Sequence, residues 1–144
     1  MKILFFTQYF WPENFRINEL VHFLSKKKSL VLTSYPSYPQ KKKFDKNIYL
    51  RKKFFSKNCE IKRVPVYLRN NTNLSIILNY ITFFFSSFVI GFFKIFKKKF
   101  DVVFVFCPSP IINAIPAILF KKIFKKKIII WVLDLWPDTV VDLK

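Results

Sequence analysis

The segment IIIWVLDLWPD spans residues 128–138 and joins an uncharged run rich in Ile and Val to an acid, a Pro and a second acid. Such an apolar run predicts a strand that is buried on both faces, as in a parallel sheet. Ligands bind at the carboxyl ends of strands in these sheets, so Asp134 is a candidate site residue. Pro137 fixes its own φ and pushes Trp136 toward an extended conformation, which predicts a stiff turn after the strand.

The rest of the chain alternates between short apolar runs and helical periodicity, and its 144 residues are enough for one domain. Further strands are predicted at residues 2–7, 30–33, 60–67 and 101–106. Helices are predicted at residues 14–28, 74–96 and 111–124. Pro116 lies within the last helix and predicts a late start or a kink, and NNTN at 70–73 supplies caps. This order indicates an α/β domain with a Rossmann-like, mostly parallel sheet and helices on both faces.

Composition excludes several classes of protein. Hydrophobic residues make up 52% of the chain, which excludes disorder as its main state. The chain has one glycine and so cannot build a glycine-rich phosphate loop. Cys59 and Cys107 match no metal or redox spacing, which fits a reducing compartment. The apolar run at the N-terminus is interrupted at Gln8 and Glu13, so a signal peptide is not expected. A cytoplasmic location is expected instead.

The net charge of +18 is the second strong feature of the chain. Such a charge favours an anionic partner: nucleic acid, acidic lipid headgroups or a phosphorylated ligand. A compositional bias that raises Lys, Ile, Phe and Asn together is an alternative explanation. The lysine runs mostly follow predicted helices, where cations favour the helix C-terminus. The runs lie at 26–28, 41–43, 97–99 and 125–127.

The segment 74–96 carries no charge before Lys94 and is long enough to cross a bilayer. Its polar residues scatter over one side of a helical wheel, the mixture expected for a helix with one face in the core and the other among headgroups. These residues are Asn79, Thr82, Ser86 and Ser87. Three interpretations stay open: a core helix that touches a membrane with the help of the lysines at 97–99, a plain core helix, and a transmembrane span.

Four loops should gather at the carboxyl edge of the predicted sheet, at residues 8–14, 34–38, 107–110 and 134–138. Each of them contains a proline. Stiff loops rich in Tyr, Trp and Pro suit sugar rings and a lipid-linked substrate better than a bare phosphate. The simpler alternative is that these prolines only terminate strands.

Five segments of the chain, given at the end of this paragraph, resemble in their order and spacing the N-terminal domain of family 4 glycosyltransferases with the GT-B fold. The resemblance covers essentially the whole chain and is closest to bacterial enzymes of capsule, O-antigen and colanic acid assembly. QYFWPE at 8–13 and DLWPD at 134–138 are its more specific motifs. The matching segments are MKILFFTQYFWPENFRINEL, VLTSYPSYPQ, NYITFFFSS, VFCPSP and WVLDLWPDTV.

The resemblance implies transfer of a sugar from a nucleotide sugar to a polyprenyl-diphosphate-linked acceptor, without a metal or other cofactor. Residues 1–144 would form the acceptor-side domain, peripheral at the anionic inner face of the cell membrane. Residues 8–13 would face the donor diphosphate. Asp134 would act as a base or orient the acceptor, unless it only caps a helix near Thr139. The candidate substrate-binding residues are Gln8, Tyr9, Trp11, Glu13, Tyr35, Tyr38, Ser109, Trp136 and Asp138.

Two departures from the family pattern matter. The first loop lacks the glycine pair of many members, and the only histidine, His22, falls on the first predicted helix instead of at the end of the fifth strand. The donor-binding C-terminal domain is expected to be absent, so the chain is expected to be a truncated enzyme or half of a split one, inactive alone. The alternatives are a non-catalytic membrane-associated module anchored by residues 74–96 and, less in keeping with dispersed lysines, a nucleic-acid binder.

Overall fold

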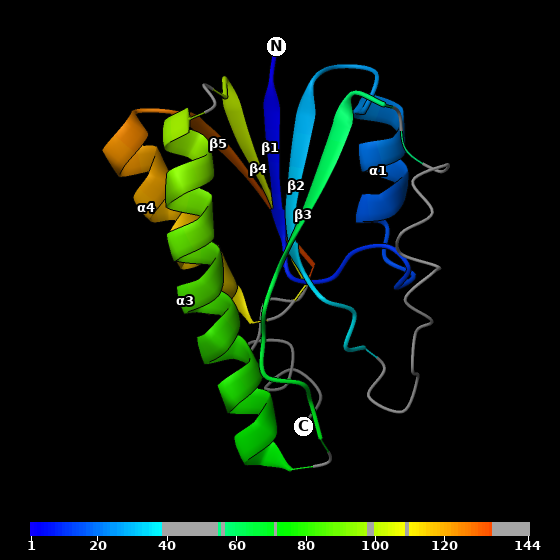
Figure 1. Cartoon of the computed structure of the whole chain (residues 1–144), viewed down its shortest axis with the longest axis vertical. Helices are drawn as coiled ribbons and strands as arrows, with labels where there is room; N and C mark the ends of the chain where they lie inside the picture. The colour runs from blue at the N-terminus through cyan, green and yellow to red at the C-terminus, as the bar shows by residue number, and fades with distance from the viewer. Residues whose placement is uncertain (39–54, 56, 71, 98–99, 109, 134–144) are drawn as a thin grey trace, which may run out of the picture.

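The computed structural model describes residues 1–38, 55, 57–70, 72–97, 100–108 and 110–133 (Figure 1). Five parallel strands form one sheet in the order β3-β2-β1-β4-β5. The strands are β1 (Ile3–Thr7), β2 (Ser29–Ser34), β3 (Cys59–Val64), β4 (Val102–Cys107) and β5 (Lys127–Val132). The helices are α1 (Ile17–Leu24), α3 (Asn73–Lys97), the 3-10 helix η2 (Ile111–Ala114) and α4 (Ile115–Phe124).

Helix α1 covers one face of this sheet, and α3 and α4 cover the other (Figure 1). The element order agrees with the order predicted from the sequence. The predicted α/β fold with a Rossmann-like parallel sheet and helices on both faces is therefore confirmed. The parallel direction of all five strands places their carboxyl ends at one edge of the sheet.

Several element boundaries differ from the predicted ones for local reasons. β3 ends at Val64, because Pro65 has no N–H to continue the ladder. Pro116 lies in the first turn of α4, after η2, so the predicted late start of this helix is confirmed. The Thr72 hydroxyl accepts a hydrogen bond from the backbone N–H of Ser75 at 3.3 Å and caps α3, as the polar run at 70–73 predicts.

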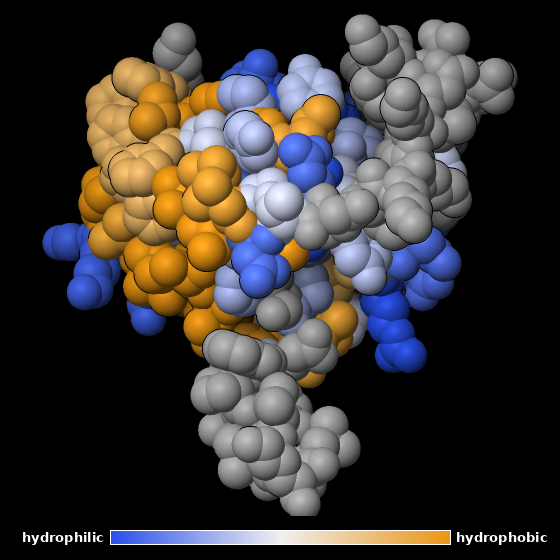
Figure 2. Space-filling model, turned by 90° about the horizontal axis from the view of Figure 1, so that it is seen from below, coloured by the Kyte–Doolittle hydropathy of each residue, from blue (hydrophilic) through white to orange (hydrophobic). Residues whose placement is uncertain are grey.

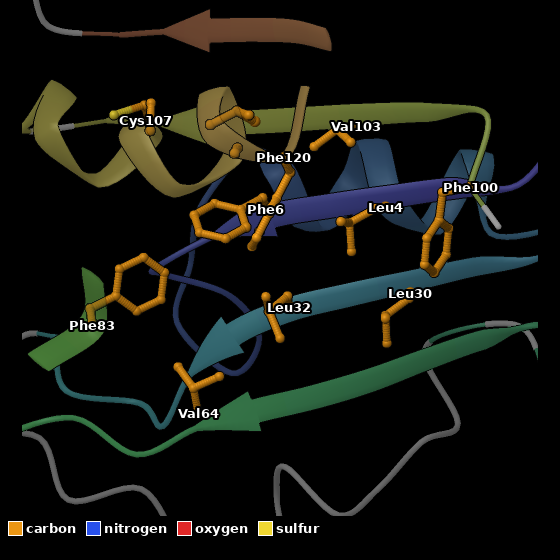
Figure 3. Packing of buried hydrophobic residues seen from close by; sticks show 13 residues of the cluster. Leu4, Phe6, Leu30, Leu32, Val64, Phe83, Phe100, Val103, Cys107 and Phe120 are labelled. Carbon is orange, nitrogen blue, oxygen red and sulfur yellow. The ribbon is translucent and has the colours of Figure 1, made fainter. Parts of the chain in front are cut away.

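The two faces of the sheet have separate apolar cores. The larger core joins side chains of β1, β2 and β4 to α3 and α4, and its residues point toward one another in Figure 3. Its centre is aromatic: Phe6 contacts both Phe83 and Phe120, with ring centroids 5.7 and 6.3 Å apart. The smaller core lies under α1, where Ile17 and Val21 are fully buried.

The position of β5 corrects one prediction. The run 128–132 was expected to be buried on both faces, yet Ile129 and Ile130 are exposed. β5 is an edge strand of the described sheet, and α1 lies over the strands at the other side. Ile128 packs on the α3–α4 core, and Trp131 contacts Phe106 on the opposite face. The strand is therefore only partly covered.

Helix α3 packs toward the sheet with side chains that are small or polar, apart from Phe83. Its buried residues recur every four positions: Ser75, Asn79, Phe83, Ser87 and Gly91. Its outward side is apolar. Two of the polar residues singled out in the sequence, Asn79 and Ser87, lie on the side that faces the core and are fully buried. The outward residues are exposed in this structure, unlike those of a helix that is buried all round.

Gly91, the only glycine of the chain, lies where α3 packs tightly against α4 and β2. A Cβ atom at this position would lie 2.7 and 2.8 Å from two ring atoms of Phe120, and 3.0 Å from the Leu32 Cδ2 atom. The Phe120 ring is fully buried and stacked on Phe88, so it cannot swing away. Glycine is thus required here by space.

The substitution Gly91→Ala tests this close approach. On an open helix surface a Gly→Ala substitution would stabilise the fold by up to about 1 kcal/mol. At position 91 the added methyl group would overpack the core, which costs about 1–3 kcal/mol. We expect a net loss in the free energy of unfolding, measured by urea denaturation. In a Phe120→Leu background the ring edge is gone and Gly91→Ala should cost less. An equal or higher stability of the single variant would contradict the packing described.

Candidate functional site

The carboxyl ends of the strands meet at the edge that lies at the bottom of Figure 1 and faces the viewer in Figure 2. The loop after β1 is fixed to the end of β2 through the Gln8 carbonyl. This oxygen accepts hydrogen bonds from the Ser34 N–H at 3.2 Å, the Ser34 hydroxyl at 2.7 Å and the Thr33 hydroxyl at 3.1 Å. The backbone at the centre of the edge is therefore held in one place.

The Gln8 side chain joins this loop to α3 and η2, on the face of the sheet opposite to α1. Its Nε2 donates to the Asn79 Oδ1 atom of α3 at 2.7 Å, and its Oε1 accepts from the Asn113 Nδ2 atom of η2. Asn79 also donates to the Tyr67 carbonyl at 2.6 Å. All three amide residues are buried. We call Gln8, Asn79, Asn113 and the adjacent Arg69 the amide cluster.

Arg69 supplies the positive charge of the amide cluster. Its Nε donates to Asn79 Oδ1 at 3.1 Å, and its guanidinium lies 5.4 Å from the Tyr9 ring centroid and 4.8 Å from that of Tyr80. Its Nη2 atom is buried and finds no hydrogen-bond acceptor among the described residues. The Asn113 Oδ1 atom is likewise buried without a donor from this part of the chain. Buried polar groups without a partner are costly, so each of these atoms calls for a partner such as water, an ion or a ligand.

Tyr9 forms the aromatic wall beside Arg69. It is buried, and its ring stacks on Phe15 with centroids 5.1 Å apart and tilts against Tyr38 at 5.7 Å. Burial raises the pKa of the Tyr9 hydroxyl well above its usual value, so it stays protonated at neutral pH. Tyr9 can therefore donate a hydrogen bond but cannot act as a general base.

Glu13 braces the loops after β1 and β2. Its Oε1 accepts from the backbone N–H groups of Ser37 at 2.8 Å and Tyr38 at 2.7 Å, and its Oε2 accepts from the N–H of Phe10 at 3.1 Å. The residue is only 2% exposed. Burial raises the pKa of the Glu13 carboxyl to about 7, although the three N–H groups and the charge of Arg63 oppose this. Its geometry is that of a positioning residue.

The other predicted site residues are distributed unevenly. Trp11 is half-buried; its backbone N–H donates to Asn18 Oδ1 at 2.9 Å, and its backbone carbonyl accepts from Arg63. Tyr35 and Tyr38 are exposed at the same edge. The structure thus brings together the candidates of the first two loops. The remaining candidates lie outside the described residues: Ser109, Asp134, Trp136 and Asp138.

The sequence interpretation missed Arg69, Tyr80, Asn79 and Asn113 as site residues. Asn79 was noted only as an interruption of an apolar helix, and Asn113 lies in a similar apolar segment. A lone amide in such a segment is the signal that could have identified both, because a buried polar group needs a partner. Arg69 follows β3 after an irregular stretch, and nothing in the sequence pairs it with Gln8.

Thiol chemistry is not supported in this part of the chain. Cys59 and Cys107 are free and buried, and burial raises the pKa of the Cys107 thiol to about 11 and also raises that of Cys59. Both thiols therefore stay protonated at neutral pH and are poor nucleophiles. Among the described residues, no group of three or more His, Cys, Asp or Glu side chains is placed to hold a metal ion.

The raised pKa of Glu13 predicts a pH-dependent stability. The folded state holds the proton more tightly than the unfolded chain, so the stabilisation is present below the ordinary pKa of 4.5 and is lost as the pH rises through about 7. Urea denaturation should give a free energy of unfolding about 2 kcal/mol lower at about pH 8 than at about pH 5.

Glu13→Gln provides the control for this effect, because it removes the titrating group and leaves the other acids unchanged. The variant should lose the part of the pH dependence that is due to position 13, whatever its absolute stability. Parallel pH profiles for the two proteins would mean that Glu13 titrates as it does in the unfolded chain.

No protein-family model, curated protein or solved structure matches this chain. The resemblance to family 4 glycosyltransferases rests on the sequence motifs themselves. QYFWPE at 8–13 supplies Gln8 and Glu13, the two residues that hold the loops of the site together. DLWPD at 134–138 lies outside the described residues.

Proposed function

We propose that this chain is the acceptor-binding part of a GT-B glycosyltransferase that acts on a lipid-linked saccharide. The observation that carries the proposal is Arg69, a half-buried side chain whose Nη2 finds no acceptor among the described residues at the carboxyl edge of the parallel sheet. Ligands of open α/β sheets bind at this edge. A guanidinium that no described carboxylate neutralises is suited to a phosphate group of the substrate.

The aromatic side chains around Arg69 support a saccharide next to that phosphate. Tyr9 and Tyr80 flank the guanidinium, and Tyr35 and Tyr38 expose their rings at the same edge. Aromatic rings offer flat apolar faces with a polar tip, a chemistry that suits sugar rings. A diphosphate on Arg69 with its sugar against the tyrosines is the arrangement we propose for the acceptor.

Sugar transfer in this proposal needs a second domain that holds the nucleotide sugar. The GT-B resemblance implies that the reaction takes place between two domains, of which the described sheet supplies one wall. The donor domain could be joined to this chain or supplied as a separate polypeptide. The described residues would bind and orient the acceptor, with Gln8 and Glu13 fixing the loops that line it.

The substitution Arg69→Gln tests the proposed phosphate contact. Hydrogen bonds to charged groups contribute about 1.5–3 kcal/mol, so we expect about a 10- to 100-fold loss of affinity for a short-chain prenyl-diphosphate saccharide, measured by calorimetry. Arg69→Lys should retain part of the affinity, because it keeps the charge but loses the planar fork. Thermal unfolding of each variant checks that the fold is intact.

Lys26→Gln is the control, since Lys26 is exposed just after α1, at the opposite edge of the sheet and on its other face. It removes the same charge and should leave acceptor binding unchanged. Equal losses in the two variants would indicate a nonspecific charge effect and would contradict the assignment of Arg69. The activity itself is checked by joining the chain to a GT-B donor domain and measuring sugar transfer to the lipid acceptor.

A further inference from the structure

Helix α3 presents an unbroken apolar stripe to the outside. Seven of its outward residues, spaced three or four positions apart, are each at least 45% exposed. At a rise of about 1.5 Å per residue the stripe is about 33 Å long. It consists of Leu74, Ile77, Ile81, Phe85, Val89, Phe93 and Phe96.

The second helical segment on this layer extends the stripe into a surface. Ile111 and Ile112 of η2, and Ile115 and Ile123 of α4, are exposed. Hydrophobic side chains gather on the side of the molecule where these helices lie, and hydrophilic ones border them (Figure 2). We call these four residues and the α3 stripe the apolar surface. Exposed apolar areas of this extent mark interaction sites.

The charged side chains on the helices of the apolar surface have one sign. Lys121 and Lys122 in the last turn of α4 and Lys125 just after it are exposed, and the whole chain carries +18. Neither α3, η2 nor α4 contains an acidic residue. An anionic partner is therefore favoured. A second copy of this chain would bring its own excess of positive charge to the contact.

The attachment of α3 to the sheet limits how this helix can be oriented relative to a bilayer. Asn79 bonds to Gln8 near one end of the helix, Thr82 accepts from the Tyr67 N–H, and Lys94 pairs with Glu60 of β3 at 3.2 Å near the other end. The segment Asn73–Lys94 is long and apolar enough to span a membrane by length and composition alone. A span would carry the charged strand β3 into hydrocarbon or break these bonds, so the helix is suited to lie flat.

We propose that the apolar surface docks on an anionic lipid bilayer, with α3 parallel to the membrane plane. The outward Phe and Ile side chains would enter the boundary between headgroups and acyl chains, and the lysines of α4 would contact anionic headgroups. The inward Ser, Asn and Gly residues keep the helix on the sheet. This inference does not rest on the proposed activity, because it needs no saccharide or donor.

Vesicle flotation of the full chain tests the proposal, with phosphatidylcholine vesicles that contain or lack phosphatidylglycerol. We expect binding to the anionic vesicles that weakens as salt is added. Phe85→Gln should lower the vesicle affinity about tenfold, since it removes one aromatic side chain that the bilayer would bury. Phe23→Gln is the matched control: Phe23 is 73% exposed and Phe85 62%, but Phe23 lies on α1, on the opposite layer. It should bind as the parent does.

The charged part of the interface is tested by Lys121→Gln combined with Lys122→Gln. Each cation near an anionic surface contributes about 1 kcal/mol, so the pair should lower the affinity by about 30-fold and flatten the salt dependence. Phe85→Trp adds a probe of depth: after the signal of the three native tryptophans is subtracted, its added fluorescence should shift to the blue and be quenched by brominated lipid, whereas that of Phe23→Trp should not change.

Four outcomes would overturn the proposal. Absence of flotation with anionic vesicles would exclude a lipid surface, and equal binding by Phe85→Gln and Phe23→Gln would place the contact elsewhere. Retention in the membrane after alkaline carbonate would mean a span. Self-association in sedimentation that Phe85→Gln abolishes, without vesicle binding, would mean that a second copy covers the apolar surface. None of these results depends on acceptor binding by Arg69.

Discussion

The arrangement of the helices and loops at the carboxyl edge depends on the hydrogen bonds of Gln8, whose side chain is buried. It lies at the end of the central strand and bonds to an amide on α3 and to another on η2, while its carbonyl holds the end of β2. Buried amides are costly when unpaired, so each of these partners fixes the position of the others. The same contact places Arg69 at the carboxyl edge.

This constraint also explains the unusual orientation of α3. Asn79 must face inward to reach Gln8, and the other inward positions, four residues apart, are Ser75, Phe83, Ser87 and Gly91, all but Phe83 small. Their small size lets the helix approach the sheet closely, as at Gly91. Many large apolar side chains of α3, such as Phe85 and Phe93, are then left exposed on the outside. A single polar network thus links the candidate site to the apolar surface.

The fold was largely predictable from the sequence, whereas the site was predictable only in part. Strands and helices followed from apolar periodicity, and the order of elements indicated a parallel sheet because short connections and right-handed crossovers leave few alternatives. Gln8, Tyr9 and Glu13 were recognised as loop residues. Their partners in α3 and after β3 were not, since contacts between residues about 70 positions apart leave no local pattern.

The sequence by itself determined the α/β class, the strand and helix segments, the excess of positive charge and the absence of a glycine-rich phosphate loop, because these depend on local pattern and composition. Only the tertiary structure decided which side of α3 faces the sheet. A helical wheel shows that two sides differ, but which side is buried depends on where hydrogen-bond partners and space exist. It likewise decided that β5 lies at the edge, since strand order is set by packing between distant segments.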